Sequence, residues 1–213
     1  RDETDLQIYL EEDVDGDLQH TGYEQELALF FLDIKNFTPF IEKYLPFDVI
    51  HIIRRLFALF RRCIESCDGK IIETAGDGFY AVFGFNTNLA TAANQAFAAA
   101  QSILKEMEEM NQQYVEKHFF HQFEAGIGLH AGKVIVGNIG IGVNNNLTVM
   151  GLPVNIASRI QAATRRLNNS LAVSEAFYQM LTPEPFSTRV ETVLKGIKEP
   201  HILHLCGMPY KEE

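Results

Sequence analysis

The chain has 213 residues, of which 46% are hydrophobic and 22% are charged. This length accommodates one domain with tails, and the composition is too apolar for a disordered protein. No run approaches about 18 uninterrupted apolar residues, so we expect no membrane contact by this segment. The formal net charge of −10 argues against a broad nucleic-acid-binding surface, and we expect no nucleic-acid partner. An acidic protein that handles a polyphosphate must therefore use a few placed cations or a metal ion.

Cysteine usage points to a reducing compartment. The chain has three cysteines, Cys63, Cys67 and Cys206, and no histidine at zinc-finger spacing lies near the first two. An odd, low number is not a disulfide framework, so we expect small buried thiols in a cytoplasmic domain. The sequence starts at Arg1 and shows no signal peptide, which we interpret as a domain cut from a longer protein.

The hydrophobic pattern predicts the elements in chain order. Residues 1–25 are polar and acidic, which predicts a linker or loose arm before a domain over 26–207 and a tail over 208–213. Apolar runs and alternation predict strands at 27–32, 70–75, 79–85, 122–129, 134–138, 147–150, 171–173, 188–194 and 202–205. Helical spacing predicts helices at 46–67, 89–110 and 153–167, and one from Ser174. Turns are expected at 76–78 and 132–133, and a Gly/Asn loop at 140–146. This order predicts an α+β sheet with helices on one face.

Two aspartates are candidate metal ligands. Asp33 follows the predicted strand at 27–32, and Asp77 lies in the predicted hairpin turn Gly76-Asp77-Gly78. In a sheet whose first strand lies beside that hairpin, both carboxylates meet at one edge, where they repel unless a cation lies between them. Such oxygen ligands suit Mg²⁺ or Mn²⁺, with a phosphate completing the coordination. Taken singly, Asp33 could instead be a helix N-cap and Asp77 a plain turn residue.

Glycines and a polar helical pair are further candidates. The segment Gly126-Ile127-Gly128 lies inside a predicted strand and opens no helix, so close backbone approach is favoured over a dinucleotide-binding loop. Asn155 and Arg159 are four residues apart on a predicted helix, so they project from one face. The asparagine can donate to a sugar oxygen and the arginine can bind phosphate oxygens, although a solvated polar stripe explains this pair as well. Lys195 beside Gly196 is, taken alone, a surface lysine.

Taken together, these segments resemble the catalytic domain of class III nucleotidyl cyclases, the adenylate and guanylate cyclases. The matching stretches are FLDIKNFT at 31–38, GKIIETAGDGFYAVF at 69–83, GIGLHAGKVIVGNIG at 126–140, VMGLPVNIASRI at 149–160 and LKG at 194–196. The resemblance spans about residues 26–206. It implies a ferredoxin-like βαββαβ core with a mainly antiparallel sheet, plus C-terminal additions. It also implies a head-to-tail homodimer whose clefts take residues from both chains.

The resemblance implies a role for each matching residue. Asp33 and Asp77 match the two aspartates that bind two divalent cations, Mg²⁺ or Mn²⁺, and the Ile34 backbone carbonyl matches a third ligand. Asn155 matches the asparagine that orients the ribose, and Arg159 matches the arginine on the transferring phosphate.

Two lysines match positions on the phosphate side. Lys195 matches the lysine that binds the terminal phosphates, and Lys133 falls where many members have a basic residue near the triphosphate. Leu152 and Pro153 depart from the family, which commonly has a polar residue followed by threonine, and this departure affects the local helix start.

The implied activity is conversion of a nucleoside triphosphate to a 3′,5′-cyclic nucleotide and pyrophosphate. In the family, two positions govern which base is accepted. Glu73 stands where guanylate cyclases have glutamate and adenylate cyclases usually have lysine, and its carboxylate can accept hydrogen bonds from guanine N1–H and the 2-amino group. Against adenine N1 the carboxylate is a mismatch of about 1–3 kcal/mol. Thr148 is neutral, because a hydroxyl both donates and accepts.

We therefore favour GTP as the substrate, with ATP as the alternative. A hypothesis of another class is a non-catalytic cyclase-homology module that only dimerises or regulates. Because Asp33, Asp77, Asn155 and Arg159 are all present, the catalytic interpretation is preferred. A regulatory domain is expected to be fused to this segment or to control it.

Overall fold

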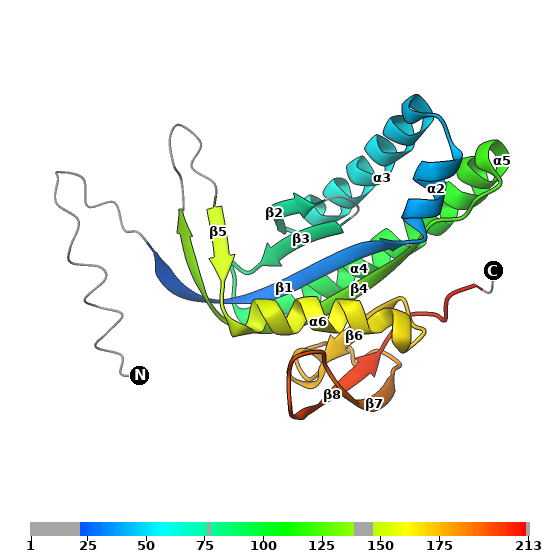
Figure 1. Ribbon diagram of the computed structural model, residues 1–213. Coiled ribbons are helices and arrows are strands. Elements are labelled where there is room, and N and C mark those ends of the chain that lie inside the picture. The colour runs from blue at the N-terminus through cyan, green and yellow to red at the C-terminus, as the bar shows by residue number, and fades with distance from the viewer. Residues whose placement is uncertain (1–21, 76–77, 139–146, 212–213) are drawn as a thin grey trace, which may run out of the picture.

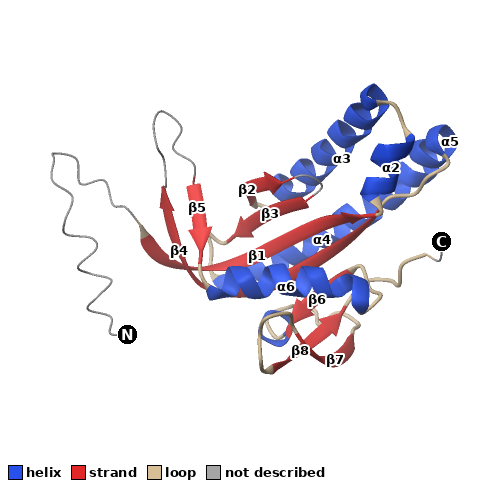
Figure 2. Ribbon diagram, viewed as in Figure 1, coloured by secondary structure: helices blue, strands red, loops and turns tan. Residues whose placement is uncertain are grey.

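The computed structural model describes residues 22–75, 78–138 and 147–211 (Figures 1 and 2). Its strands are β1 (Tyr23–Lys35), β2 (Lys70–Ala75), β3 (Gly78–Phe83), β4 (Glu124–Asn138), β5 (Leu147–Met150), β6 (Leu171–Ser174), β7 (Thr188–Val193) and β8 (Pro200–Leu205). Its helices are α2 (Phe37–Lys43), α3 (Pro46–Ser66), α4 (Leu89–Met110), the π-helical η1 (Asn111–Val115), α5 (Glu116–Phe119), α6 (Leu152–Arg166) and α7 (Glu175–Tyr178).

One sheet organises these elements. Its strand order is β2-β3-β1-β4-β6-β8-β7, and β5 pairs with β4. The four strands β2, β3, β1 and β4 pair with one another antiparallel, and α3 and α4 connect them in the order βαββαβ. Of the remaining pairings, the one between β4 and β6 is parallel. The expected α+β fold with a ferredoxin-like core, a mainly antiparallel sheet and C-terminal additions is therefore confirmed.

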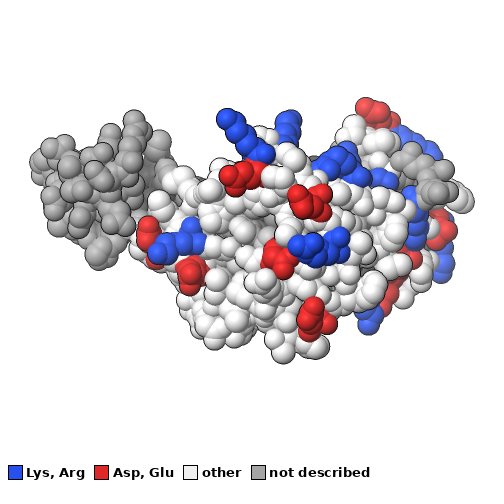
Figure 3. All heavy atoms as spheres, turned by 90° about the horizontal axis from the view of Figure 1, so that it is seen from below, with Lys and Arg blue, Asp and Glu red and all other residues white. Residues whose placement is uncertain are grey.

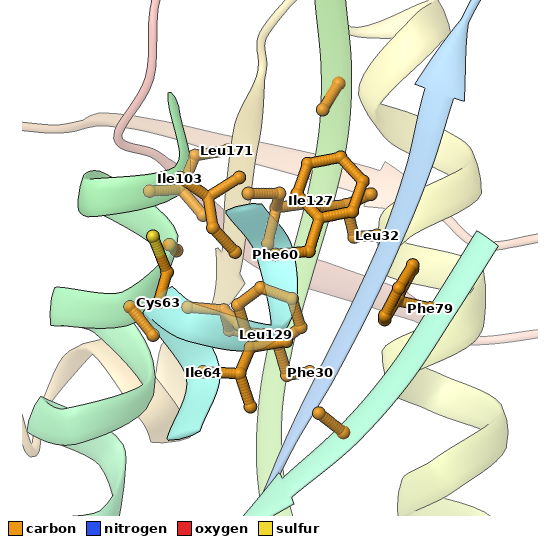
Figure 4. Close-up of a cluster of buried hydrophobic side chains, with 14 of the residues drawn as sticks. Phe30, Leu32, Phe60, Cys63, Ile64, Phe79, Ile103, Ile127, Leu129 and Leu171 are labelled. Atoms are coloured by element: carbon orange, nitrogen blue, oxygen red, sulfur yellow. The ribbon is translucent and has the colours of Figure 1, made fainter. Parts of the chain in front are cut away.

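The main core lies between the sheet and the helices α3 and α4. Phe30 and Leu32 of β1 are buried in one cluster with Phe60 of α3 and Ile103 of α4 (Figure 4). Side chains alternate along a strand, so Leu29 points to the opposite face, where it shares a second cluster with residues of α6. Helices on one face were expected. This holds for α3 and α4 of the core, whereas α6 packs on the other face (Figure 1).

The strand β4 is continuous where the sequence predicted a turn. Gly132 and Lys133 are paired with Leu27 and Glu26 of β1, in an unbroken register. The turn prediction is wrong because this glycine serves another purpose. A Cβ atom on Gly132 would lie 2.7 Å from Pro153 Cγ, so the missing side chain makes room for the start of α6.

The end of β1 also differs from the expectation. The strand continues to Lys35, so Asp33 lies inside it and not after it. The short helix α2, which the sequence pattern did not reveal, begins after Asn36, whose φ of 56° is left-handed. Asn36 is thus the N-cap, and the alternative in which Asp33 caps a helix is excluded. The predicted turn residues 76–77 and the whole of the predicted loop 140–146 lie outside the described residues.

Glycines of β4 bring α6 unusually close to the sheet. A Cβ on Gly126 would lie 2.3 Å from Thr164 Oγ1, and a Cβ on Gly128 would lie 2.3 Å from the Gln161 backbone nitrogen. A Cβ on Gly128 would meet helix backbone, so any side chain there must displace the helix, whereas a side chain on Gly126 would displace the side chains of Thr164, Gln161 and Tyr210. The expectation that these glycines mark a close backbone approach is confirmed.

We predict that Gly128→Ala lowers the free energy of unfolding by about 1–3 kcal/mol, the usual cost of overpacking, because the added methyl group meets helix backbone. The measurement is urea denaturation. Gly22→Ala is the control, since a Cβ there would lie no closer than 3.4 Å to its neighbours, and a change within about 0.5 kcal/mol is expected. Equal stability of the two variants would contradict the close-packing interpretation.

Candidate active site

A groove of about 470 Å³ lies between α6 and the strands β1, β3 and β5. Its polar side is lined by Asp33 of β1 together with Asn155, Ser158 and Gln161 of α6. The three α6 residues are spaced by three, so they follow one face of the helix along the groove. The structure therefore brings together two residues far apart in the sequence, Asp33 and Asn155, which were both expected in the site.

Asp33 is held in the middle of the sheet. Its Cα partners are Gly78 of β3 and Gly126 of β4, and neither partner has a side chain that could fill the space beside the carboxylate. Ile34 is fully buried in the core under α3 and α4, which leaves Asp33 on the α6 face. Gly78 is the chain neighbour of Asp77, and Asp77 itself lies outside the described residues.

The other side of the groove is aromatic. The rings of Phe31 and Tyr80 are stacked, with centroids 4.5 Å apart and planes 10° apart. The Tyr80 hydroxyl donates to the Val149 carbonyl oxygen of β5 at 3.4 Å. Burial raises the pKa of Tyr80, so the phenol remains a protonated donor at neutral pH. This hydrogen bond ties β5 to the central sheet across the groove.

The two expected base-selecting positions lie beside this aromatic pair. The Cα of Glu73 in β2 is paired with Tyr80 of β3. Thr148 of β5 precedes Val149 and is paired with Gly137 of β4. Tyr80 is thus the neighbour of both strands that carry these positions.

Three cationic residues that were expected in the site are not among the described residues that line the groove. Arg159 is exposed on α6, one turn after Asn155. Lys195 is exposed after β7, next to the buried Leu194. Lys133 is exposed and lies 3.8 Å from Glu24, and it is seven residues along β4 from the partner of Asp33, or about 23 Å.

The expected metal ligands are all oxygen donors. Two aspartate carboxylates and the Ile34 carbonyl suit Mg²⁺ or Mn²⁺ by their chemistry, and Asp33 is the carboxylate that the described groove lining provides. Among the residues that the structure describes, no group of three or more His, Cys, Asp and Glu residues is placed to hold a metal ion. The fit to two cations therefore depends on Asp77.

The groove continues into a smaller cavity that the sequence analysis missed. This cavity, of about 170 Å³, shares Asp33 and Gln161 with the groove and is also lined by Lys35, Arg165 and Tyr210. Lys35 could have been found, because residues two apart in a strand share a face and Asp33 is two residues away. Tyr210 carried no signal, since it stands outside any periodic segment.

The surface carries no single-sign field on the face drawn in Figure 3. Acidic and basic side chains are interspersed there. This agrees with recognition by a few placed groups. None of the described helices is both long and apolar enough to cross a membrane.

The comparisons with known proteins agree with the fold and show the family. The adenylate and guanylate cyclase catalytic domain family matches residues 19–206, and the chain belongs to this family. An adenylate cyclase of Anabaena cylindrica is 28% identical over 167 residues, which are 78% of this chain and 33% of that protein. The chain thus spans about a third of that relative's length.

Two solved structures share the fold. The adenylyl cyclase CyaB from P. aeruginosa has a TM-score of 0.79 at 22% identity, covering 86% of this chain and 95% of that chain. The guanylyl cyclase Cya2 has a TM-score of 0.79 at 24% identity, covering 90% of this chain and 96% of that chain. The expected family resemblance is therefore confirmed.

A partly buried histidine lies on the same face of β4 as the glycines beneath α6. His130 Nδ1 is 2.7 Å from Ser174 Oγ. Burial, together with the nearby His201, lowers the pKa of His130 to about 4. The native protein therefore holds this imidazole neutral, whereas the unfolded chain protonates it below its ordinary pKa of about 6.5.

We predict that stability declines as the pH falls from about 6.5 towards 4, because the unfolded state then binds more protons than the native state. The contribution of His130 is complete above this window and is lost within it, by on the order of 3 kcal/mol. Urea unfolding of His130→Asn at several pH values should show a shallower decline. His51→Asn, at an exposed position, is the control, and an unchanged slope in His130→Asn would refute the assignment.

Proposed function

We propose that the chain is a catalytic unit that converts a nucleoside triphosphate to a 3′,5′-cyclic nucleotide and pyrophosphate. The observation that carries this proposal is the placement of Asp33 and Asn155 in one groove of a cyclase-family fold. Asp33 offers a metal-binding carboxylate, and Asn155 offers an amide that can orient a ribose.

In the proposed reaction, the ribose 3′-oxygen attacks the α-phosphorus. A new oxygen–phosphorus bond forms, the bond to the oxygen that bridges to the β-phosphate breaks, and pyrophosphate leaves with that electron pair. The hydroxyl proton goes to solvent. When bound, divalent cations supply Lewis-acid stabilisation of the attacking oxygen and the leaving phosphates.

The protein's own groups position the substrate and stabilise charge. Asn155 orients the ribose, so the intramolecular attack starts from an aligned geometry. Arg159 stabilises the charge that develops on the α-phosphate, and Lys195 that on the leaving group. Lys133, which lies about 23 Å along β4 from the partner of Asp33, is proposed to lie near a triphosphate only at the site completed by a second copy.

We further propose a head-to-tail homodimer. Arg159 and Lys195 are exposed and lie outside the groove lining of their own described chain, which supports delivery of both cations to a second copy. A two-fold dimer of this kind contains two equivalent sites. Since the chain spans about a third of its Anabaena relative, we also propose that a regulatory domain accompanies it in a longer, cytoplasmic protein.

GTP is the proposed substrate. The Cα pairing of Glu73 with Tyr80, which lines the groove, supports this proposal. A carboxylate there favours guanine, as its acceptor oxygens match the guanine N1–H and amino donors. ATP is the alternative, and it is favoured by the name of the Anabaena relative.

The deciding experiment is incubation with GTP or with ATP in the presence of Mn²⁺, followed by chromatography of the product. We expect more cyclic GMP than cyclic AMP. More cyclic AMP would support the alternative substrate. If neither product forms, the result would support a non-catalytic dimerisation or regulatory module. The presence of Asp33, Asn155 and Arg159 argues against such a module.

Loss of Arg159 should affect turnover far more than substrate binding. We predict that Arg159→Ala lowers kcat by a factor of about 10²–10³ with a small change in KM, as for other lost transition-state donors. Steady-state kinetics measures both. Arg61→Ala, an exposed arginine on α3, is the control and should retain wild-type kcat. An unchanged kcat in Arg159→Ala would remove the assignment.

The dimer model predicts complementation between inactive variants. Mixing Asp33→Ala with Arg159→Ala should restore about a quarter of wild-type activity, because half of the dimers are mixed and each has one intact site. Each variant alone is the control. No recovery would instead place Asp33 and Arg159 in the same site of one chain.

A further inference from the structure

The smaller cavity beside Asp33 is rich in hydrogen-bond donors. Lys35 and Arg165 each contribute a cation to its lining and Gln161 contributes an amide, whereas the hydroxyl groups of Thr164 and Tyr210 donate to backbone carbonyl oxygens. A diphosphate group presents only acceptors, so it matches this set, whereas Asp33 at the boundary with the groove repels it unless a divalent cation lies between them.

The cavity continues the groove along α6. Asn155 lines the groove and Arg165 the cavity, and ten residues of helix separate them, or about 15 Å. Asp33 and Gln161 belong to both spaces. A nucleotide whose phosphates lie at Asp33 can therefore extend them into the cavity.

Lys35 is the cation that the fold holds in place. Its side chain is 19% exposed, and its ammonium group lies 3.9 Å from a Glu124 oxygen, a long ion pair that leaves donors available. The same ammonium lies 4.8 Å from the centre of the Tyr210 ring, at cation–π distance. Arg165, by contrast, is exposed.

The ring of Tyr210 is fixed by the C-terminal segment 207–211, which follows the family match ending at residue 206. The Tyr210 hydroxyl donates to the Ala125 carbonyl oxygen at 3.3 Å, and its backbone nitrogen donates to Asn168 Oδ1 at 3.1 Å. The backbone nitrogen of Lys211 donates to Glu124 Oε1 at 2.9 Å. These bonds dock the segment on the start of β4 and on Asn168, which follows α6.

We propose that Lys35 binds the diphosphate group of the substrate, and of the pyrophosphate released, and that Tyr210 is a positioning residue that holds Lys35 in the cavity. This inference rests on the proposed function, because that function supplies the diphosphate. It adds a binding residue on β1 and gives the C-terminal segment a role in the site.

The test is calorimetric binding of pyrophosphate, with Mn²⁺ present, to the full chain and its variants. Lys35→Met should weaken binding about tenfold, the order expected for one charge-assisted hydrogen bond, and Lys35→Arg should restore it. Lys117→Met, at an exposed position on α5, is the control and should bind as the wild type does. Thermal melting of each variant shows that it is folded.

Variants of Tyr210 separate the contribution of its ring to pyrophosphate binding from that of its hydroxyl group. Tyr210→Phe keeps the ring over Lys35 and should bind pyrophosphate nearly as tightly as the wild type. Tyr210→Leu removes the ring and should weaken binding several-fold, and in the background of Lys35→Met it should have no additional effect. Equal affinity of Tyr210→Leu and the wild type would overturn the positioning role.

Kinetic constants distinguish the two sources of the diphosphate. A rise in both the KM for the nucleotide and the inhibition constant for pyrophosphate in Lys35→Met supports the proposal in full. A rise in the inhibition constant alone overturns the substrate contact.

Failure of this inference can be told apart from failure of the proposed function. If the wild type forms a cyclic nucleotide while Lys35→Met binds pyrophosphate normally, the inference is overturned and the cyclase activity stands. If pyrophosphate binds through Lys35 and no cyclic nucleotide forms, the diphosphate site is supported and the proposed function is wrong.

Discussion

The contact between α6 and the glycines of β4 is the constraint on which the site depends. A Cβ on Gly128 would lie 2.7 Å from Gln161 Cα and 2.3 Å from the Gln161 backbone nitrogen. The backbone of β4 therefore packs directly against the backbone of α6 at this point. The helix cannot approach so closely over any other residue. Because backbone fixes this distance, the height of Asn155 and Gln161 above Asp33 does not depend on flexible side chains. The glycines of β4 thus set how closely α6, which forms one wall of the groove, lies over the sheet.

The sequence predicted the fold well where a single local rule decided the structure. Apolar residues at helical spacing located α3 and α4 with nearly correct ends, and alternation located most strands. It failed where one residue type serves two purposes. Gly132 was interpreted as a turn, and a glycine that makes room for Pro153 looks the same in the sequence. The element that packs on the strand decides between a turn and a close approach. The tertiary structure determines that element, and the local sequence does not show it.

The candidate site shows the same division. Asp33 and Asn155 were identified because they lie in sequence motifs that occur in the order typical of the family. The structure places both at one groove. Lys35 could have been predicted, because it is two residues from Asp33 in one strand and so lies on the same face. It was overlooked because no role in the family was assigned to its position. Tyr210 reaches Ala125 across 85 residues of chain, from a segment without hydrophobic period. A contact of that kind arises from docking of the tail, which no local pattern encodes.

The rigidity of α6 bears on how two chains could share the site. Asn155 and Arg159 are four residues apart on one helix, so they move as a unit. In the proposed dimer, a copy that delivers Arg159 to its partner must also deliver Asn155. The Asn155 seen beside Asp33 of its own chain then belongs to the neighbouring site of the pair. Both sites must therefore lie along one continuous cleft, with the two α6 helices near the two-fold axis that relates them.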